Sequence, residues 1–297
     1  MKAILAMIAA ASLASSAARP AQSRPSGKSR ARQVFVSVSD AGGAPVLDLS
    51  PADFEVKEAG VQRPATRATL GADAMRIVMV ADTSDGAAAA LTHIRAGLLT
   101  FLDALPPEHE VMIVSTGRQT RVRVPPTIDR KKLKDAAAGL FSDGGATVLT
   151  DTVLEMDDRF LRKADHRWPV FVIVTGDGTE GSTGAHEKQF DQWIAAMPAR
   201  GITAHAVVLK YKGGGTPEII ASHLAQTCGG IYEFINTSNS LPERMKVVAD
   251  RIVADTKAMA TWYTVEFQSD GPENGPLEVG VARSGIKLRI SHRRGAQ

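Results

Sequence analysis

Four short runs of apolar residues, each ending at a polar loop, restrict most strongly what this chain can fold into. They lie at 77–81, 111–114, 170–174 and 204–209, and segments of helical periodicity separate them. Continuous runs rich in β-branched residues are typical of strands that helices cover on both faces. The alternation predicts an α/β fold, a doubly wound and mostly parallel sheet with right-handed crossovers. The expected helices span 87–105, 129–140, 147–163, 187–199, 217–227 and 241–257.

The segments on either side of this region have the two-residue alternation of half-buried strands. Strand-like stretches are expected at 33–39, 46–49 and 53–57, and again at 261–268, 277–282 and 286–292. A module of about 40 residues is too small to be stable alone. We therefore predict an N-terminal β module at 33–72, a central α/β domain at 75–257, and C-terminal strands at 260–293 that pair with the N-terminal module as a small accessory sheet.

The N-terminus has the composition of a secretory signal peptide. Lys2 precedes an uncharged, Ala-rich stretch that ends in small residues, so we expect residues 1–18 to be removed after Ala18. A basic, Pro- and Ser-rich linker at 19–32 follows. The single cysteine, Cys228, excludes an intramolecular disulfide and is expected to be a small buried hydrophobe. The protein is therefore expected to be exported, to the periplasm or beyond the cell.

The distribution of charge argues against a nucleic-acid partner. The chain has 35 basic and 32 acidic residues, but one basic residue is Lys2 of the expected signal peptide, and ten more lie near the two ends, five within 19–32 and five within 283–294. The body from 33 to 282 keeps 24 basic and 32 acidic residues, a net charge of −8, which disfavours phosphate binding. No later uncharged apolar run reaches the ~18 residues of a membrane span, so no membrane span is expected.

Oxygen-bearing side chains follow the predicted strands. Asp82 and Ser84 lie in DTSDG after the first run, Thr147 lies in SDGGAT before the third helix, and Asp177 lies in TGDG after a central strand. In an open α/β sheet, ligands bind beyond the carboxyl ends of the strands. Carboxylate and hydroxyl oxygens are the ligands that Mg²⁺ prefers. These four residues are therefore candidate ligands of a divalent cation.

These motifs resemble, in order and spacing, the von Willebrand factor A-type domain over roughly residues 75–253. That family holds a divalent cation at a metal-ion-dependent adhesion site, built from an Asp-x-Ser-x-Ser loop, a Thr in a second loop and an Asp after a later strand. The flanks, FVSVSDAGGAPVLDLSPADFEVKEAG and TWYTVEFQSD, resemble strand modules found beside this domain in exported bacterial proteins. The resemblance covers nearly the whole chain after the N-terminus.

The resemblance implies a Rossmann-like domain. It also implies that this domain binds another protein and is not itself an enzyme. It implies that Ser84 and Thr147 coordinate Mg²⁺ or Mn²⁺ directly, while Asp82 and Asp177 act mainly through bound water. One coordination position would remain for an exposed Asp or Glu of the partner protein.

Two positions depart from the family pattern. Gly86 replaces the last Ser of the first motif, so one ligand oxygen is missing, and Gly176 stands where Ser or Thr is frequent. Water or the Asp85 carboxylate is the expected substitute ligand. The alternative is a metal-independent scaffold or binding protein with a decayed metal site, which recognises its partner through loops at 182–184 and 212–215.

Other interpretations compete with the metal site. Taken singly, Asp82, Ser84, Thr147 and Asp177 are residue types that commonly cap helices or hold turns. The G-x-G-x-x-G pattern at 176–181 lacks the acidic residue that a dinucleotide site needs at the next strand end. The motifs G-x-S-x-G, H-E-x-x-H and G-x-x-x-x-G-K-[ST] are absent, so no enzymatic activity is expected.

Overall fold

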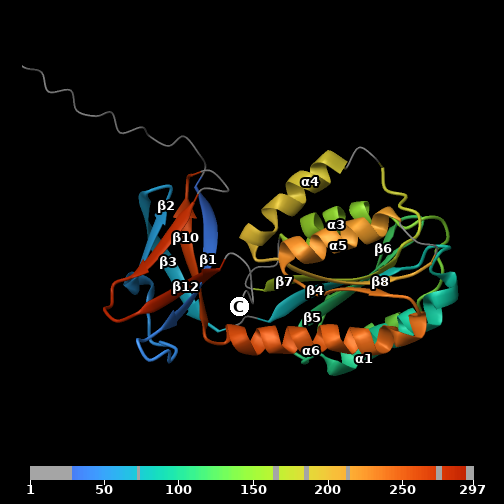
Figure 1. Cartoon of the computed structure of the whole chain (residues 1–297), viewed down its shortest axis with the longest axis horizontal. Coiled ribbons are helices and arrows are strands. Elements are labelled where there is room, and N and C mark those ends of the chain that lie inside the picture. Colours follow the sequence, from blue (N-terminus) through green and yellow to red (C-terminus); the bar gives the residue numbers. More distant parts are fainter. Residues whose placement is uncertain are drawn as a thin grey trace, which may run out of the picture.

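The chain forms two six-stranded sheets that lie side by side along the long axis of the molecule (Figure 1). This computed structural model describes residues 29–71, 74–162, 167–183, 187–211, 215–271 and 276–291. The expected signal peptide at 1–18 and most of the expected linker at 19–32 lie outside these ranges. No helix within them is long and apolar enough to cross a membrane.

The first sheet carries the four apolar runs at its centre. Its strand order is β6-β5-β4-β7-β8-β9. All neighbours pair in parallel except β5 and β6, which are antiparallel. The strands are β4 (Met75–Asp82), β5 (Glu110–Thr116), β6 (Thr120–Thr127), β7 (Trp168–Gly176), β8 (Thr203–Leu209) and β9 (Tyr232–Ile235).

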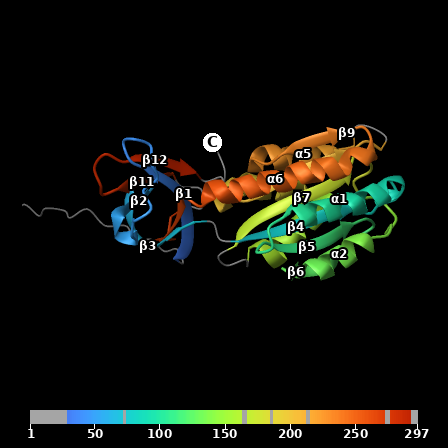
Figure 2. The ribbon, with the colours of Figure 1, turned by 90° about the horizontal axis from the view of Figure 1, so that it is seen from below.

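Helices cover both faces of this sheet, which explains why its strands are continuously apolar. In β4, Ile77 and Met79 pack toward α1, α2 and α6, whereas Val78 and Val80 pack toward α3, α4 and α5. Figure 2 views the molecule from the side of α1, α2 and α6. The helices are α1 (Leu91–Ala104), α2 (Arg130–Ala138), α3 (Leu149–Met156), α4 (Glu187–Ala196), α5 (Thr216–Cys228) and α6 (Leu241–Met259). The α/β fold predicted from the sequence is confirmed.

The second sheet is antiparallel and takes strands from both ends of the chain. Its order is β11-β2-β3-β10-β1-β12. Apolar side chains of β1, β2 and β10 form a core of their own on one face of it. The strands are β1 (Arg30–Ser39), β2 (Phe54–Glu58), β3 (Val61–Leu70), β10 (Trp262–Ser269), β11 (Leu277–Val281) and β12 (Lys287–Ser291).

The two sheets meet where β1 approaches β7 and where α6 leads into β10. The ring of Phe35 in β1 lies 4.5 Å from that of Trp168 at the start of β7. Helix α6 also ends only three residues before β10 begins, so the two units are linked without a long connection (Figure 1).

The structure corrects the sequence expectation at several places. The segment 46–49 is not a strand, because only the Val46 N–H bonds to β1, at Val38, and the Leu49 N–H bonds to the Tyr263 hydroxyl instead. Strands β3 and β6 were not predicted, since their small, charged and Pro residues dilute the apolar alternation. The helix expected at 147–163 starts at Leu149 and changes to a π-helical turn at 157–161.

His205 in β8 makes the stability of the fold depend on pH. Its Nδ1 accepts the Ile231 N–H at 3.1 Å, and burial lowers the pKa of the imidazole to about 3. The unfolded chain binds a proton here below about pH 6.5, whereas the folded chain does not until about pH 3. Acid therefore favours unfolding. The free energy of unfolding decreases through this residue as the pH falls from 6.5 toward 3.

We expect His205→Gln to reduce the acid sensitivity of the fold. Between pH 7.5 and pH 5, His205 should lower the free energy of unfolding by about 2 kcal/mol, a loss that the glutamine variant escapes. Urea unfolding at both pH values measures this difference. His223→Gln, at an exposed position of α5, is the control. An equal loss of stability in wild type and His205→Gln would contradict the prediction.

Candidate functional site

The four predicted site residues lie at one edge of the parallel sheet. Asp82 ends β4, Ser84 follows it, Asp177 follows β7, and Thr147 precedes α3. All four are buried, with 5% or less of each residue exposed. They lie at the same edge because parallel strands present their carboxyl ends there. Hydrogen bonds link Thr147 to the end of β5 and the Asp177 N–H to the end of β8.

Asp82 organises the first loop. Its Oδ1 accepts the Ser84 N–H at 2.8 Å, a bond that closes a tight turn after the strand. Burial raises the pKa of Asp82 to about 6, although hydrogen bonds from Ser84, the Gly176 backbone and Thr175 act in the opposite direction. Ser84 does not cap α1, whose N-terminal residue makes no side-chain capping bond.

Thr147 is held by β5 rather than by the helix that follows it. Its hydroxyl donates to the Thr116 carbonyl at 3.2 Å and lies 3.1 Å from the Thr116 hydroxyl. The Glu180 carboxylate accepts the N–H groups of Leu149 and Thr150 at the start of α3. The helix-capping explanation for Thr147 is therefore not what the structure shows.

Asp143 is a site-forming residue that sequence reasoning missed. Its carboxylate accepts bonds from the hydroxyls of Thr83 at 2.7 Å and Ser115 at 2.8 Å, and from the Arg123 guanidinium at 2.6 Å. Burial acts to raise the pKa of Asp143, but the bonds from Thr83, Arg123 and Ser115 outweigh it and keep the pKa low. Asp143 thereby ties the second loop to the first. Arg123 lies on β6, which the sequence did not reveal, so the partnership had no visible signal.

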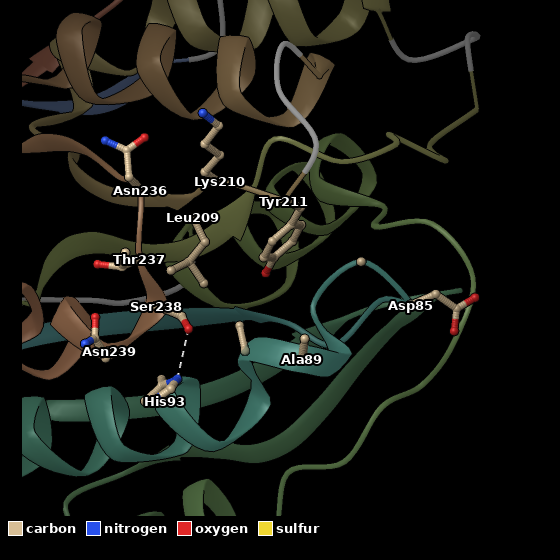
Figure 3. A pocket seen from close by; sticks show the side chains of 12 residues that line it. Asp85, Ala89, His93, Leu209, Lys210, Tyr211, Asn236, Thr237, Ser238 and Asn239 are labelled. Carbon is tan, nitrogen blue, oxygen red and sulfur yellow. Dashed lines mark hydrogen bonds between the residues drawn. The ribbon is translucent and has the colours of Figure 1, made fainter.

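Asp85, the expected substitute ligand, braces the second loop. Its Oδ2 accepts the Gly145 N–H at 2.9 Å, and its own N–H donates to the Gly145 carbonyl at 3.0 Å. Figure 3 shows its side chain turned away from Tyr211. In this arrangement Asp85 joins the two loops instead of filling the place of the missing Ser.

Tyr211, two residues after β8, lies over the third loop. Its N–H donates to Asp177 Oδ1 at 2.5 Å. Its ring covers Gly176 so closely that a Cβ there would overlap ring carbons, and a Cβ on Gly86 would lie 3.1 Å from the ring. Burial, with the nearby charges of Asp82 and Asp177, raises the pKa of the phenol, so it stays protonated. The sequence clue to this role of Tyr211 was that Gly86 and Gly176 stand at family positions that usually carry hydroxyls. The glycines alone did not indicate which side chain fills the space above them.

A hollow of about 680 Å³ opens beside Tyr211 at the same edge (Figure 3). Its walls come from the start of α1, the end of β8 and the segment 236–239. Within its wall, His93 Nδ1 lies 2.9 Å from the Ser238 hydroxyl. The polar groups of 236–239 and the end of β8 therefore border an open hollow at this edge.

The residues present do not fit a divalent cation as they stand. Gly86 offers no side-chain oxygen. The aromatic carbons of Tyr211, which cannot serve as oxygen ligands, lie between the loops that carry Ser84 and Asp177. Magnesium demands near-octahedral oxygen coordination at about 2.1 Å. Among the described residues, no group of three or more His, Cys, Asp and Glu side chains is placed to hold a metal ion. The ligand roles of Asp82, Ser84, Thr147 and Asp177 stay predictions.

No protein-family model and no curated protein sequence matches this chain. Solved structures do share its fold. The von Willebrand factor type A protein from Catenulispora acidiphila aligns with a TM-score of 0.52 and 11% identity, over 89% of this chain and 75% of that protein. BatB from Bacteroides thetaiotaomicron aligns with a TM-score of 0.48 and 14% identity, over 61% of this chain and 99% of BatB.

A third similar structure is a mussel byssus protein. Proximal thread matrix protein 1, described with a zinc-occupied MIDAS motif, aligns with a TM-score of 0.49 and 14% identity, over 68% of this chain and 50% of that protein. At such identities a structural likeness shows the fold alone. The assignment of the fold rests on the Catenulispora protein, whose TM-score is 0.52. The von Willebrand factor A-like fold predicted from the motifs is confirmed.

Proposed function

We propose that this chain, which has a von Willebrand factor A-like fold, is a protein-binding module and not an enzyme. Its partner would meet the carboxyl edge of the parallel sheet. The observation that carries the proposal is the hollow at this edge, set beside the buried carboxylates and hydroxyls of three loops. Ligands of open α/β sheets bind at this edge. The N-terminal pattern at 1–18 supports an exported protein.

Two versions of this function differ in whether a cation joins the two proteins. In the first, Mg²⁺ or Mn²⁺ bridges the site to an Asp or Glu of the partner. In the second, the partner contacts the loops directly. The Tyr211 ring over Gly176 favours the second version, because it lies where the loops would have to face an ion. The loops at 182–184 and 212–215, predicted as contacts in this version, lie partly outside the described residues.

Site-specific photocrosslinking in the cells that encode the chain tests the proposed surface. We expect a photoreactive phenylalanine at Asn236 or Asn239, both exposed at the hollow, to form one discrete adduct with another protein. The same group at Glu108, exposed at the opposite ends of the strands, is the matched control and should not form it. Adducts of equal yield from Glu108, or none from either Asn position, would contradict the proposal.

A further inference from the structure

Both departures from the family's metal motif face the same side chain. Gly86 and Gly176 lie in different loops, 90 residues apart in the sequence, and the Tyr211 ring contacts the space above each. A Cβ on Gly178 would also lie 3.5 Å from this ring. One ring therefore fills the space that two family side chains would occupy, so both departures belong to a single packing arrangement.

Tyr211 is held in this place from two directions. Its main-chain N–H is bonded to Asp177 Oδ1, which fixes the start of the turn after β8. Its ring also packs against the buried core formed by β4, α1 and α6. Within the described part of the chain, the buried hydroxyl has no hydrogen-bond partner. The side chain therefore occupies its position through the ring, not through the phenol oxygen.

The consequences for a cation are steric and chemical. A serine at 86 would direct its side chain toward the ring, since even its Cβ lies only 3.1 Å away, and Ser84 Oγ lies 3.6 Å from the same Cβ position. Aromatic carbons supply none of the oxygen ligands that Mg²⁺ requires. We propose that the Tyr211 ring replaces the cation in this site, so that the chain binds no divalent cation while the ring is in place.

Calorimetric titration of Mn²⁺ and Mg²⁺ into the chelator-treated protein tests this inference. Wild type and Tyr211→Phe, which keeps the ring, should give no saturable heat at millimolar ion. The double variant Gly86→Ser/Tyr211→Ala, which supplies the missing hydroxyl and removes the ring, should gain saturable binding. Adding Asp82→Ala to the double variant should abolish that heat. Saturable binding by wild type, or none by a folded double variant, would overturn the proposal.

A second measurement needs no metal. Gly176→Ser should lower the melting temperature of wild type by at least roughly 2–4 °C, because the new side chain overlaps the ring. In a Tyr211→Ala background, the same substitution should cost much less. Additive shifts in this double-mutant cycle would show that the ring does not occupy the space above Gly176. Neither measurement involves the partner protein, so either can fail while the proposed function stands.

Discussion

Asp157→Ala should lower the free energy of unfolding by about 3–5 kcal/mol, the cost of leaving buried charge without its partner. Asp157 is fully buried where α3 passes into the π-helical turn. Arg200 donates two N–H bonds to its carboxylate, at 2.6 and 2.7 Å, and Trp193 Nε1 donates a third at 2.8 Å. Alanine would deprive the guanidinium and the indole of their carboxylate acceptor, and would remove the Trp193 bond between α4 and the π-helical turn.

The neighbouring aspartate is the matched control for this prediction. Asp158 is exposed, so Asp158→Ala should change stability by no more than about 0.5 kcal/mol. Equilibrium unfolding in urea, followed by tryptophan fluorescence and circular dichroism, compares the two variants. Arg200 keeps a quarter of its side chain exposed, which places the expected loss near 3 kcal/mol. A difference below about 1 kcal/mol between the variants would refute the assigned role.

Asp143→Ala should cost a similar amount, about 3–5 kcal/mol, and should also loosen the candidate site. The carboxylate is bonded to Thr83 in the first loop, Ser115 in β5 and Arg123 in β6. Arg121 adds a longer ion pair at 3.4 Å. Without Asp143, the buried hydroxyls and the Arg123 charge would lose their common acceptor. The second loop would also lose one of its side-chain bonds to the first, while the Asp85 bonds to Gly145 remain.

Hydrogen exchange separates a local effect from a general one. In Asp143→Ala, the amides of 83–86 and 142–147 should exchange faster than the drop in global stability explains, while β7 and β8 follow the global change. Asp135→Ala removes an exposed pair with Lys131 and should cost less than about 0.5 kcal/mol. Unchanged loop exchange in Asp143→Ala would show that another contact holds the loops together.

Much of the fold could be predicted because strand burial leaves a direct trace in the sequence. The runs at 77–81 and 170–174 are apolar throughout, since both faces of β4 and β7 are covered. Strands β3 and β6 left no such trace. Strand β6 lies at the edge of its sheet and pairs with only one neighbour, so basic and Pro residues are tolerated in it.

The candidate site divides in the same way. Asp82, Ser84, Thr147 and Asp177 could be picked out because each follows a strand or precedes a helix at a place that topology brings to one edge. Asp143 and Tyr211 could not, because their importance depends on partners far away in the sequence. The role of Asp143 depends on its bond from Arg123, which lies on an unpredicted strand. The role of Tyr211 depends on the space that Gly86 and Gly176 leave for its ring.

Three features could be inferred from the sequence alone: the α/β class, the von Willebrand factor A-like order of motifs, and the residues at the carboxyl edge of the sheet. These follow from local periodicity and from the positions of polar residues relative to strand ends. The side chain that fills the space at that edge could be identified only in the folded chain. The place of a ring such as that of Tyr211 depends on the space that two distant glycines leave open, and packing of this kind has no period along the chain.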